Sequence, residues 1–212
     1  MDKIKRIGTG VCFVLVPAIL ILGFASHPNL ADLAPPGDVE KWVAEFHGNV
    51  LWRVGHISVM WGTLPMTVIF LEWMRALKAR MPVWSFVAGA LGIVGCFMLA
   101  ADKGALALVP TAFDTLPEEQ FRQLLPGLEA MILYKGQMWM ARLYVLIPIG
   151  FILMGIALYR AKIVPRWQGA AVTLGALLLF NPDIDLISLV ASVVLAIGLV
   201  PMGFALIRNP PR

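Results

Sequence analysis

The chain has 212 residues, of which 59% are hydrophobic and 14% are charged, and its formal net charge is +4. Soluble domains carry about 25% charged residues, so this chain has too few polar groups to cover a water-soluble globule. The composition therefore excludes a soluble protein and predicts an integral membrane protein, organised as a single transmembrane domain over residues 1–212.

Six apolar segments are close to the length of about 20 residues that crosses a bilayer as a helix. The first follows basic residues as a signal peptide would, but its apolar run of 20 residues is long enough to span and is expected to be retained. The fifth is the shortest. The six predicted spans are 7–26, 54–74, 83–101, 137–159, 167–180 and 186–207.

The charge distribution predicts the orientation of these spans. If the N-terminus is cytoplasmic, eleven of the 17 basic residues lie on the inner side and eleven of the 13 acidic residues lie outside. Cytoplasmic loops of membrane proteins carry such an excess of lysine and arginine. We therefore expect an all-α bundle of six transmembrane helices in the plasma (inner) membrane, with both termini cytoplasmic.

The first of two long outer loops, 27–50, is expected to contain a short helix. Asp38 is a good N-cap for a helix from 39 to about 47, with an apolar side. Gly48 would then bend the chain before it enters the second span.

The second outer loop, 102–135, is expected to complete a cap over the outer face. Asp102-Lys103-Gly104 is predicted to end the third span. Thr115 is the predicted N-cap of an amphipathic helix that is interrupted near Pro126. All the inner connections are short, so the capped outer face is the predicted working face.

The segment around the last inner turn resembles a known type of sequence. A helix ends with Leu158-Tyr159-Arg160, a Pro165-Arg166-Trp167 turn follows, and a glycine-rich helix comes next. Residues 142–179 are in this respect similar to uncharacterised six-helix bacterial integral membrane protein families. The resemblance implies six helices and transfers no site residue.

Polar residues are concentrated where the first outer loop enters the second span. On one continuous helix at about 100° per residue, Glu45, Asn49, Arg53 and His56 would fall within a wedge of roughly 80°. Ionisable groups that enter a membrane helix normally face a partner or a water-filled cavity. This wedge is therefore a candidate binding site, provided that Gly48 does not bend the helix.

Charged residues at the outer ends of three spans suggest a network. Arg53, Asp102 and Arg142 are expected to form ion pairs, as Arg53–Asp102 or Arg142–Asp102, because lipid cannot satisfy their charges. With His56 they would form the polar floor of a pocket beneath the cap. Such a floor suits an anionic head group or another small ligand.

The three histidines, His27, His47 and His56, all fall on the predicted outer side. His27 and His56 end and begin neighbouring spans, so they are expected at similar depth. A three-histidine metal site or haem ligation by two histidines is therefore geometrically possible. No HxxxH, HxxH or HExxH spacing is present, and no cofactor is predicted, with haem or a transition metal as the alternative.

The hypothesis that these patterns favour is a non-enzymatic membrane protein. It is either an accessory or scaffolding subunit of a membrane assembly or a binder of a small or lipidic ligand beneath the cap. The alternatives are a redox or metal protein that uses the outer histidines, and a small-solute transporter. Expected partners are the lipid bilayer and other membrane subunits; nucleic acid is not expected, because no basic stretch carries interleaved aromatic residues.

Overall fold

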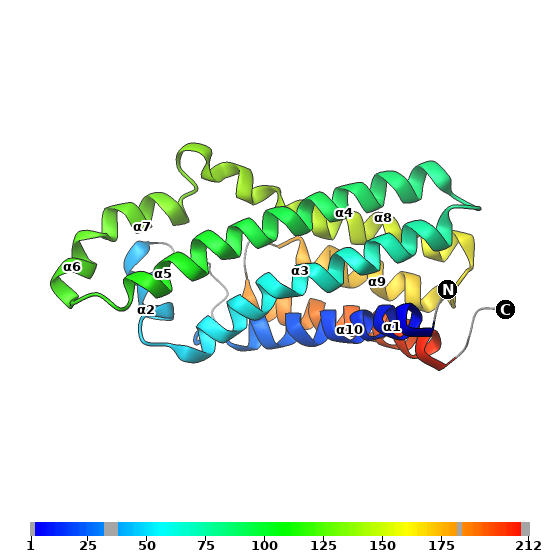
Figure 1. The fold of residues 1–212 in the computed structure, drawn as a ribbon, viewed down its shortest axis with the longest axis horizontal. Coiled ribbons are helices and arrows are strands. Elements are labelled where there is room, and N and C mark those ends of the chain that lie inside the picture. The colour runs from blue at the N-terminus through cyan, green and yellow to red at the C-terminus, as the bar shows by residue number, and fades with distance from the viewer. Residues whose placement is uncertain (1–2, 32–37, 182–183, 209–212) are drawn as a thin grey trace.

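The computed structural model describes residues 3–31, 38–181 and 184–208, and every regular element in these ranges is a helix. Figure 1 shows an elongated bundle in which the start of α1 (Lys3–Ala25) and the end of α10 (Asp185–Arg208) lie at the same end. The all-α prediction is confirmed for these ranges. The predicted charge pattern also includes Asp2, Asp32, Asp183 and Arg212, which lie outside them.

Five helical segments are long and apolar enough to cross a membrane: α1, α3 (Val50–Leu77), Pro82–Phe113, Gly136–Ala161 and α10. They overlap the first, second, third, fourth and sixth predicted spans. The fifth predicted span corresponds to α9 (Arg166–Leu179), which has 14 residues. An ideal helix needs about 20 residues to cross the hydrocarbon core, so α9 is too short to cross without its flanks.

The helices of the bundle form a closed ring. Its order is α1, α3, α4 (Pro82–Lys103), α8 (Leu146–Ala161), α9 and α10, with α10 packed back against α1. The short α9 thus has a place in the ring, between α8 and α10. The segment before α8 is η2 (Gly136–Val145), a 3₁₀ helix of ten residues that packs against α4.

Aromatic rings and close helix contacts hold the ring together. The ring centroids of Phe70 on α3 and Phe151 on α8 are 4.7 Å apart, and both side chains are fully buried. A methyl group added at Gly150 of α8 would lie 2.8 Å from Cα of Gly92 on α4. Small residues at such positions let membrane helices approach closely, and this glycine fixes the spacing of α4 and α8.

The α-helix of the third predicted span ends where it was expected to end, at Lys103, but the helical path does not end there. α4 continues into a π-helical turn, η1 (Gly104–Leu108), and then into α5 (Val109–Phe113). Gly104 has right-handed helical backbone angles, φ −60° and ψ −47°. The buried Asp102 carboxylate accepts a hydrogen bond from the Tyr134 hydroxyl at 2.7 Å. A distant side chain therefore satisfies the polar group that suggested a helix end.

The cap lies at the other end of the bundle (Figure 1). It has an apolar core of its own. It is built from α2 (Val39–Phe46), the first turn of α3, η1, α6 (Glu118–Gln123) and α7 (Leu125–Ile132). The buried members of this core are Val39, Trp42, Phe46, Trp52, Leu106, Ala107, Phe121 and Leu128.

Two of three predictions about the ends of the cap helices are confirmed. The Asp38 carboxylate accepts a hydrogen bond from the backbone N–H of Lys41 at 2.8 Å and caps α2. Pro126 lies in the first turn of α7, where α6 has already ended. Thr115 is not an N-cap, because its hydroxyl donates to the carbonyl oxygen of Ala112 at 2.7 Å and α6 has no side-chain cap.

The end opposite the cap joins the first and last helices. The Arg6 guanidinium of α1 donates hydrogen bonds to the carbonyl oxygens of Leu206 and Ile207, at 2.8 and 3.0 Å. The last carbonyl groups of a helix have no partner within it, and a basic side chain can satisfy them. Arg6 therefore caps α10 and closes the ring at this end.

Candidate functional site

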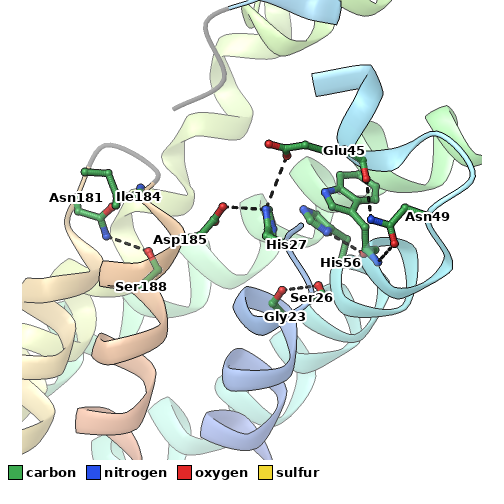
Figure 2. Close-up of polar contacts among 11 residues, drawn as sticks. Gly23, Ser26, His27, Glu45, Asn49, His56, Asn181, Ile184, Asp185 and Ser188 are labelled. Atoms are coloured by element: carbon green, nitrogen blue, oxygen red, sulfur yellow. Dashed lines mark hydrogen bonds and ion pairs between the residues drawn. The ribbon is translucent and has the colours of Figure 1, made fainter. Parts of the chain in front are cut away.

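His27 is the centre of a polar cluster between the bundle and the cap (Figure 2). It follows the last turn of α1, and its Nδ1 atom lies 3.0 Å from Oδ2 of Asp185 at the start of α10. The same nitrogen lies 3.9 Å from Oε2 of Glu45 on α2. One imidazole thus faces carboxylates from two other helices. We call His27, Glu45, His56 and Asp185 the His27 cluster.

His56 on α3 brings a second imidazole to the cluster. Its Nδ1 lies 3.0 Å from the carbonyl oxygen of Trp52, and since a carbonyl only accepts, Nδ1 carries the proton. In the neutral ring Nε2 is then an acceptor. The ring stacks on the Trp52 indole, with centroids 3.8 Å apart, and its centroid is 4.8 Å from that of His27. The prediction that His27 and His56 lie at similar depth is confirmed.

A glycine lets α1 and α3 bring these two histidines together. A methyl group at Gly55 would overlap the side chain of Ser26. The Ser26 hydroxyl instead donates to the carbonyl oxygen of Gly23 at 2.6 Å, as Figure 2 shows. Local hydrogen bonding and a missing side chain therefore set the distance between the ends of the two helices.

Two asparagines place the carboxylates of the cluster. The Asn181 carbonyl oxygen accepts from the backbone N–H of Ile184 at 2.7 Å, and its amide donates to Ser188 at 2.9 Å, which orders the start of α10 before Asp185. Asn49 caps α3 by accepting from the N–H of Trp52 at 3.1 Å, and its amide donates to the carbonyl oxygen of Glu45 at 3.0 Å. Asn49 therefore supports the cluster through the backbone.

A separate group of contacts surrounds Asp114, at the end of α5. Its carboxylate lies 2.5 Å from Nδ1 of His47 and 3.5 Å from the Arg53 guanidinium, and accepts a hydrogen bond from the N–H of Gly48 at 3.1 Å. Gly48 has a positive φ of 67°, which glycine adopts without strain. The chain bends there, so the continuous-helix wedge is not formed. We call His47, Gly48, Arg53 and Asp114 the Asp114 latch.

The remaining predicted charges form a third group around Asp102. Besides its hydrogen bond from Tyr134, Asp102 lies 3.5 Å from the Lys103 ammonium. The Arg142 guanidinium lies over the Tyr134 ring, 4.5 Å from its centroid. Neither of the predicted ion pairs, Arg53–Asp102 or Arg142–Asp102, is among the contacts of the described residues, because Arg53 binds Asp114 and a tyrosine lies between Arg142 and Asp102.

The predicted pocket floor is therefore divided among three places. His56 and Glu45 belong to the His27 cluster and Asn49 supports it, Arg53 belongs to the latch, and Asp102 and Arg142 lie together. His47 is separated from the other two histidines by its contact with Asp114. Within the described residues, no group of three or more histidine, cysteine or acidic side chains is arranged to hold a metal ion.

Sequence reasoning missed Asp185 and Asp114 as site residues. Both are acidic residues on the predicted outer side, so the charge pattern placed them at the correct end. That pattern gives depth along a helix but not the direction in which each helix faces. The ring order of the helices, which puts α10 beside α1, decides that Asp185 meets His27.

No known protein family, curated protein or solved structure matches this chain. Its function therefore has to be inferred from the geometry of its own residues.

Proposed function

We propose that this protein is a multi-pass protein of the plasma (inner) membrane that binds a small cation at the His27 cluster, beneath its outer cap, and catalyses no reaction. The observation that carries the proposal is the position of His27 between two carboxylates, 3.0 Å from Asp185 and 3.9 Å from Glu45. Acidic side chains from separate helices meet there at a nearly buried point, and carboxylates form their strongest hydrogen bonds with cations.

Two nitrogen atoms in and beside the cluster support an added ligand. Nδ1 of His27 and Nε1 of Trp52 are buried, and neither has a hydrogen-bond partner within the described residues. The 3.0 Å distance from Nδ1 of His27 to Oδ2 of Asp185 is thus a close contact without good hydrogen-bond direction. A buried donor without a partner costs about 1–3 kcal/mol. A ligand with a positive charge and an oxygen atom would satisfy both the carboxylates and these donors.

The position of the cluster favours binding over scaffolding alone. A surface that recruits another subunit has to be exposed, whereas Glu45 and His56 are each only 7% exposed. They lie where α1, α3 and α10 meet the cap helix α2. A small solute fits this position better than a protein partner.

A ligand screen by thermal unfolding tests the proposal on the purified full-length protein. Zinc chloride represents divalent metals, and ethanolamine represents small amines with an oxygen atom. We expect at least one of them to raise the melting temperature. We expect Asp185→Asn to weaken the binding of that ligand by about tenfold or more, since the variant loses a charged contact. Glu119→Gln, which removes an exposed acidic side chain of the cap, is the matched control.

Three results would contradict the proposal. A flat response to both ligands would leave only a structural role for the cluster. An unchanged response in Asp185→Asn would place the ligand elsewhere. A Soret band in the absorption spectrum of the purified protein would support the haem alternative instead.

The proposal includes six crossings with both termini in the cytoplasm. It is supported by the excess of basic residues on one side and by the place of α9 in the ring, between α8 and α10. A reporter fused after Arg212 tests it: green fluorescent protein should fluoresce and alkaline phosphatase should be inactive. The opposite result, with a cytoplasmic N-terminus, would leave an odd number of crossings and show that α9 does not cross.

A further inference from the structure

A groove of about 450 Å³ lies on the outside of the bundle between α4 and η2. Its α4 wall includes Phe97 and Met98, and its η2 wall includes Lys135, Gln137 and Met140. No lining residue belongs to the His27 cluster or to the Asp114 latch, so the groove is independent of the proposed cation site.

The conformation of η2 explains why a groove exists here. A 3₁₀ helix has 3.0 residues per turn and a rise of about 2.0 Å per residue, so it is longer and narrower than an α-helix with the same sequence. The ten residues of η2 pack alongside α4 in this form. The chain then continues as the α-helix α8. A narrow helix beside a full-width helix leaves a channel along their contact.

The two ends of the groove differ in polarity. Lys135 and Gln137 are exposed and lie at the cap end of η2, since η2 runs away from the cap. Met140 lies deeper, and so does Phe97 on the other wall, because α4 runs toward the cap. Phe97 is 69% exposed and Met140 is 42% exposed. Apolar side chains as exposed as these face lipid tails when the helices cross a bilayer.

The polar end carries the positive charge of Lys135, which no acidic side chain of the described residues neutralises. Lys135 has no ion-pair partner in the part of the chain that the structure describes. Lys103, a basic residue at the end of α4, forms an ion pair with Asp102, whose carboxylate lies 3.5 Å from the ammonium group. A cation beside a membrane surface attracts anionic lipid head groups. The remainder of the groove is lined by apolar side chains, which suits an acyl chain.

We propose that the groove between α4 and η2 binds an anionic phospholipid of the surrounding bilayer. The lipid phosphate lies against the Lys135 ammonium and the Gln137 amide, and an acyl chain lies along Phe97 and Met140. The ligand enters sideways from the membrane, so no passage through the cap is needed.

Native mass spectrometry of the full-length protein tests this inference, after reconstitution with equal amounts of phosphatidylglycerol and phosphatidylcholine. We expect the wild type to retain phosphatidylglycerol about fivefold more than phosphatidylcholine. One lysine near the membrane surface strengthens the binding of an anionic lipid by about this factor. Lys135→Gln should remove the preference. Lys78→Gln, which removes an exposed charge at the opposite end of the bundle, should keep it.

A second variant separates a built groove from general surface charge. Ala101 lines the groove and is exposed, so Ala101→Trp fills it without changing charge or core packing. We expect this variant to release both lipids while its melting temperature stays close to that of the wild type. The proposal would be overturned by equal retention of the two lipids in the wild type. It would also be overturned by equal losses of the preference in Lys135→Gln and Lys78→Gln, or by unchanged retention in Ala101→Trp. A change of oligomeric state in Ala101→Trp would assign the groove to a second copy of the chain and would overturn it too.

Discussion

Two histidine–aspartate contacts lie at the cap end of the molecule, and their surroundings are opposite in kind. In the Asp114 latch, one carboxylate faces three donors: His47, Arg53 and the N–H of Gly48. In the His27 cluster, one imidazole faces two carboxylates, Asp185 and Glu45. The Arg53 guanidinium and the Gly48 N–H balance the Asp114 carboxylate, although its Oδ1 atom has no well-directed hydrogen bond within the described residues. Acidic groups that share one imidazole instead favour an added positive charge.

The comparison indicates that nearness to a carboxylate does not by itself make a histidine functional. His47 holds the bend between α2 and α3 against the end of α5, which is a structural task. Its side chain is 48% exposed, against 16% for His27. The number of acceptors around each imidazole, together with its burial, separates the latch from the candidate ligand site.

The largest effect on stability is expected from Asp114→Ala. This change leaves the Arg53 guanidinium and the Gly48 N–H at the base of the cap without their acceptor. We expect the free energy of unfolding to fall by about 2 kcal/mol, the usual cost of lost hydrogen bonds to a charged group. Thermal unfolding and limited proteolysis of the cap measure it. Cation binding at the His27 cluster should persist in the folded protein; a variant that loses binding but keeps its stability would reverse the roles of the two sites.

Gly55→Ala should disturb the His27 cluster without removing an ionisable group. The added methyl group overlaps Ser26 and pushes α1 away from α3. We expect a loss of about 1–2 kcal/mol in unfolding free energy, as is typical of overpacking, together with weaker ligand binding. The double variant Gly55→Ala/Ser26→Gly removes the overlapping atoms and should recover most of the binding. No recovery would show that the distance between the two helices is not the controlling factor.

His47→Gln and His27→Gln should separate stability from binding. We expect His47→Gln to lower the unfolding free energy by about 1 kcal/mol, because it loses a contact with Asp114. It should leave the ligand-dependent rise in melting temperature intact. His27→Gln should abolish that rise. The comparison fails if both variants keep the rise or both lose it.

The smallest effect is expected from Glu118→Gln on α6. Glu118 and Arg122 form an ion pair at 2.8 Å, but their side chains are 60% and 73% exposed. Exposed pairs of this spacing contribute about 0.3–0.5 kcal/mol. We therefore expect a change in melting temperature close to the error of the measurement. A large loss would mean that α6 is held more tightly than its exposure indicates.

The membrane helices were predictable because hydrophobic runs and helix ends are local properties. Asp38 capped α2 as expected, and Pro126 marked the start of α7. The continuation of the helical path beyond α4 into η1 and α5 was not predictable in the same way. Asp102, the polar residue at this point, is satisfied by Tyr134, 32 residues further along the chain.

The candidate site was predictable in its depth but not in its pairing. His27 and His56 were expected to lie at one level, and they meet there. Arg53 was assigned to Asp102 instead of Asp114, because the sequence does not show that η1 and α5 extend α4 into the cap. The facing direction of each helix follows from the packing of the whole ring, which no local pattern contains.

The continuous helix from Pro82 to Phe113 links membrane thickness to the cap. Its 32 residues correspond to about 48 Å at 1.5 Å per residue, whereas the hydrocarbon core is about 30 Å thick. One rod is therefore anchored in the bilayer at one end and carries Asp114 just beyond the other. A thinner membrane tilts long helices. A tilt of this rod relative to α3 would move Asp114 against Arg53, so the attachment of the cap is the contact that would respond to such a change in the bilayer.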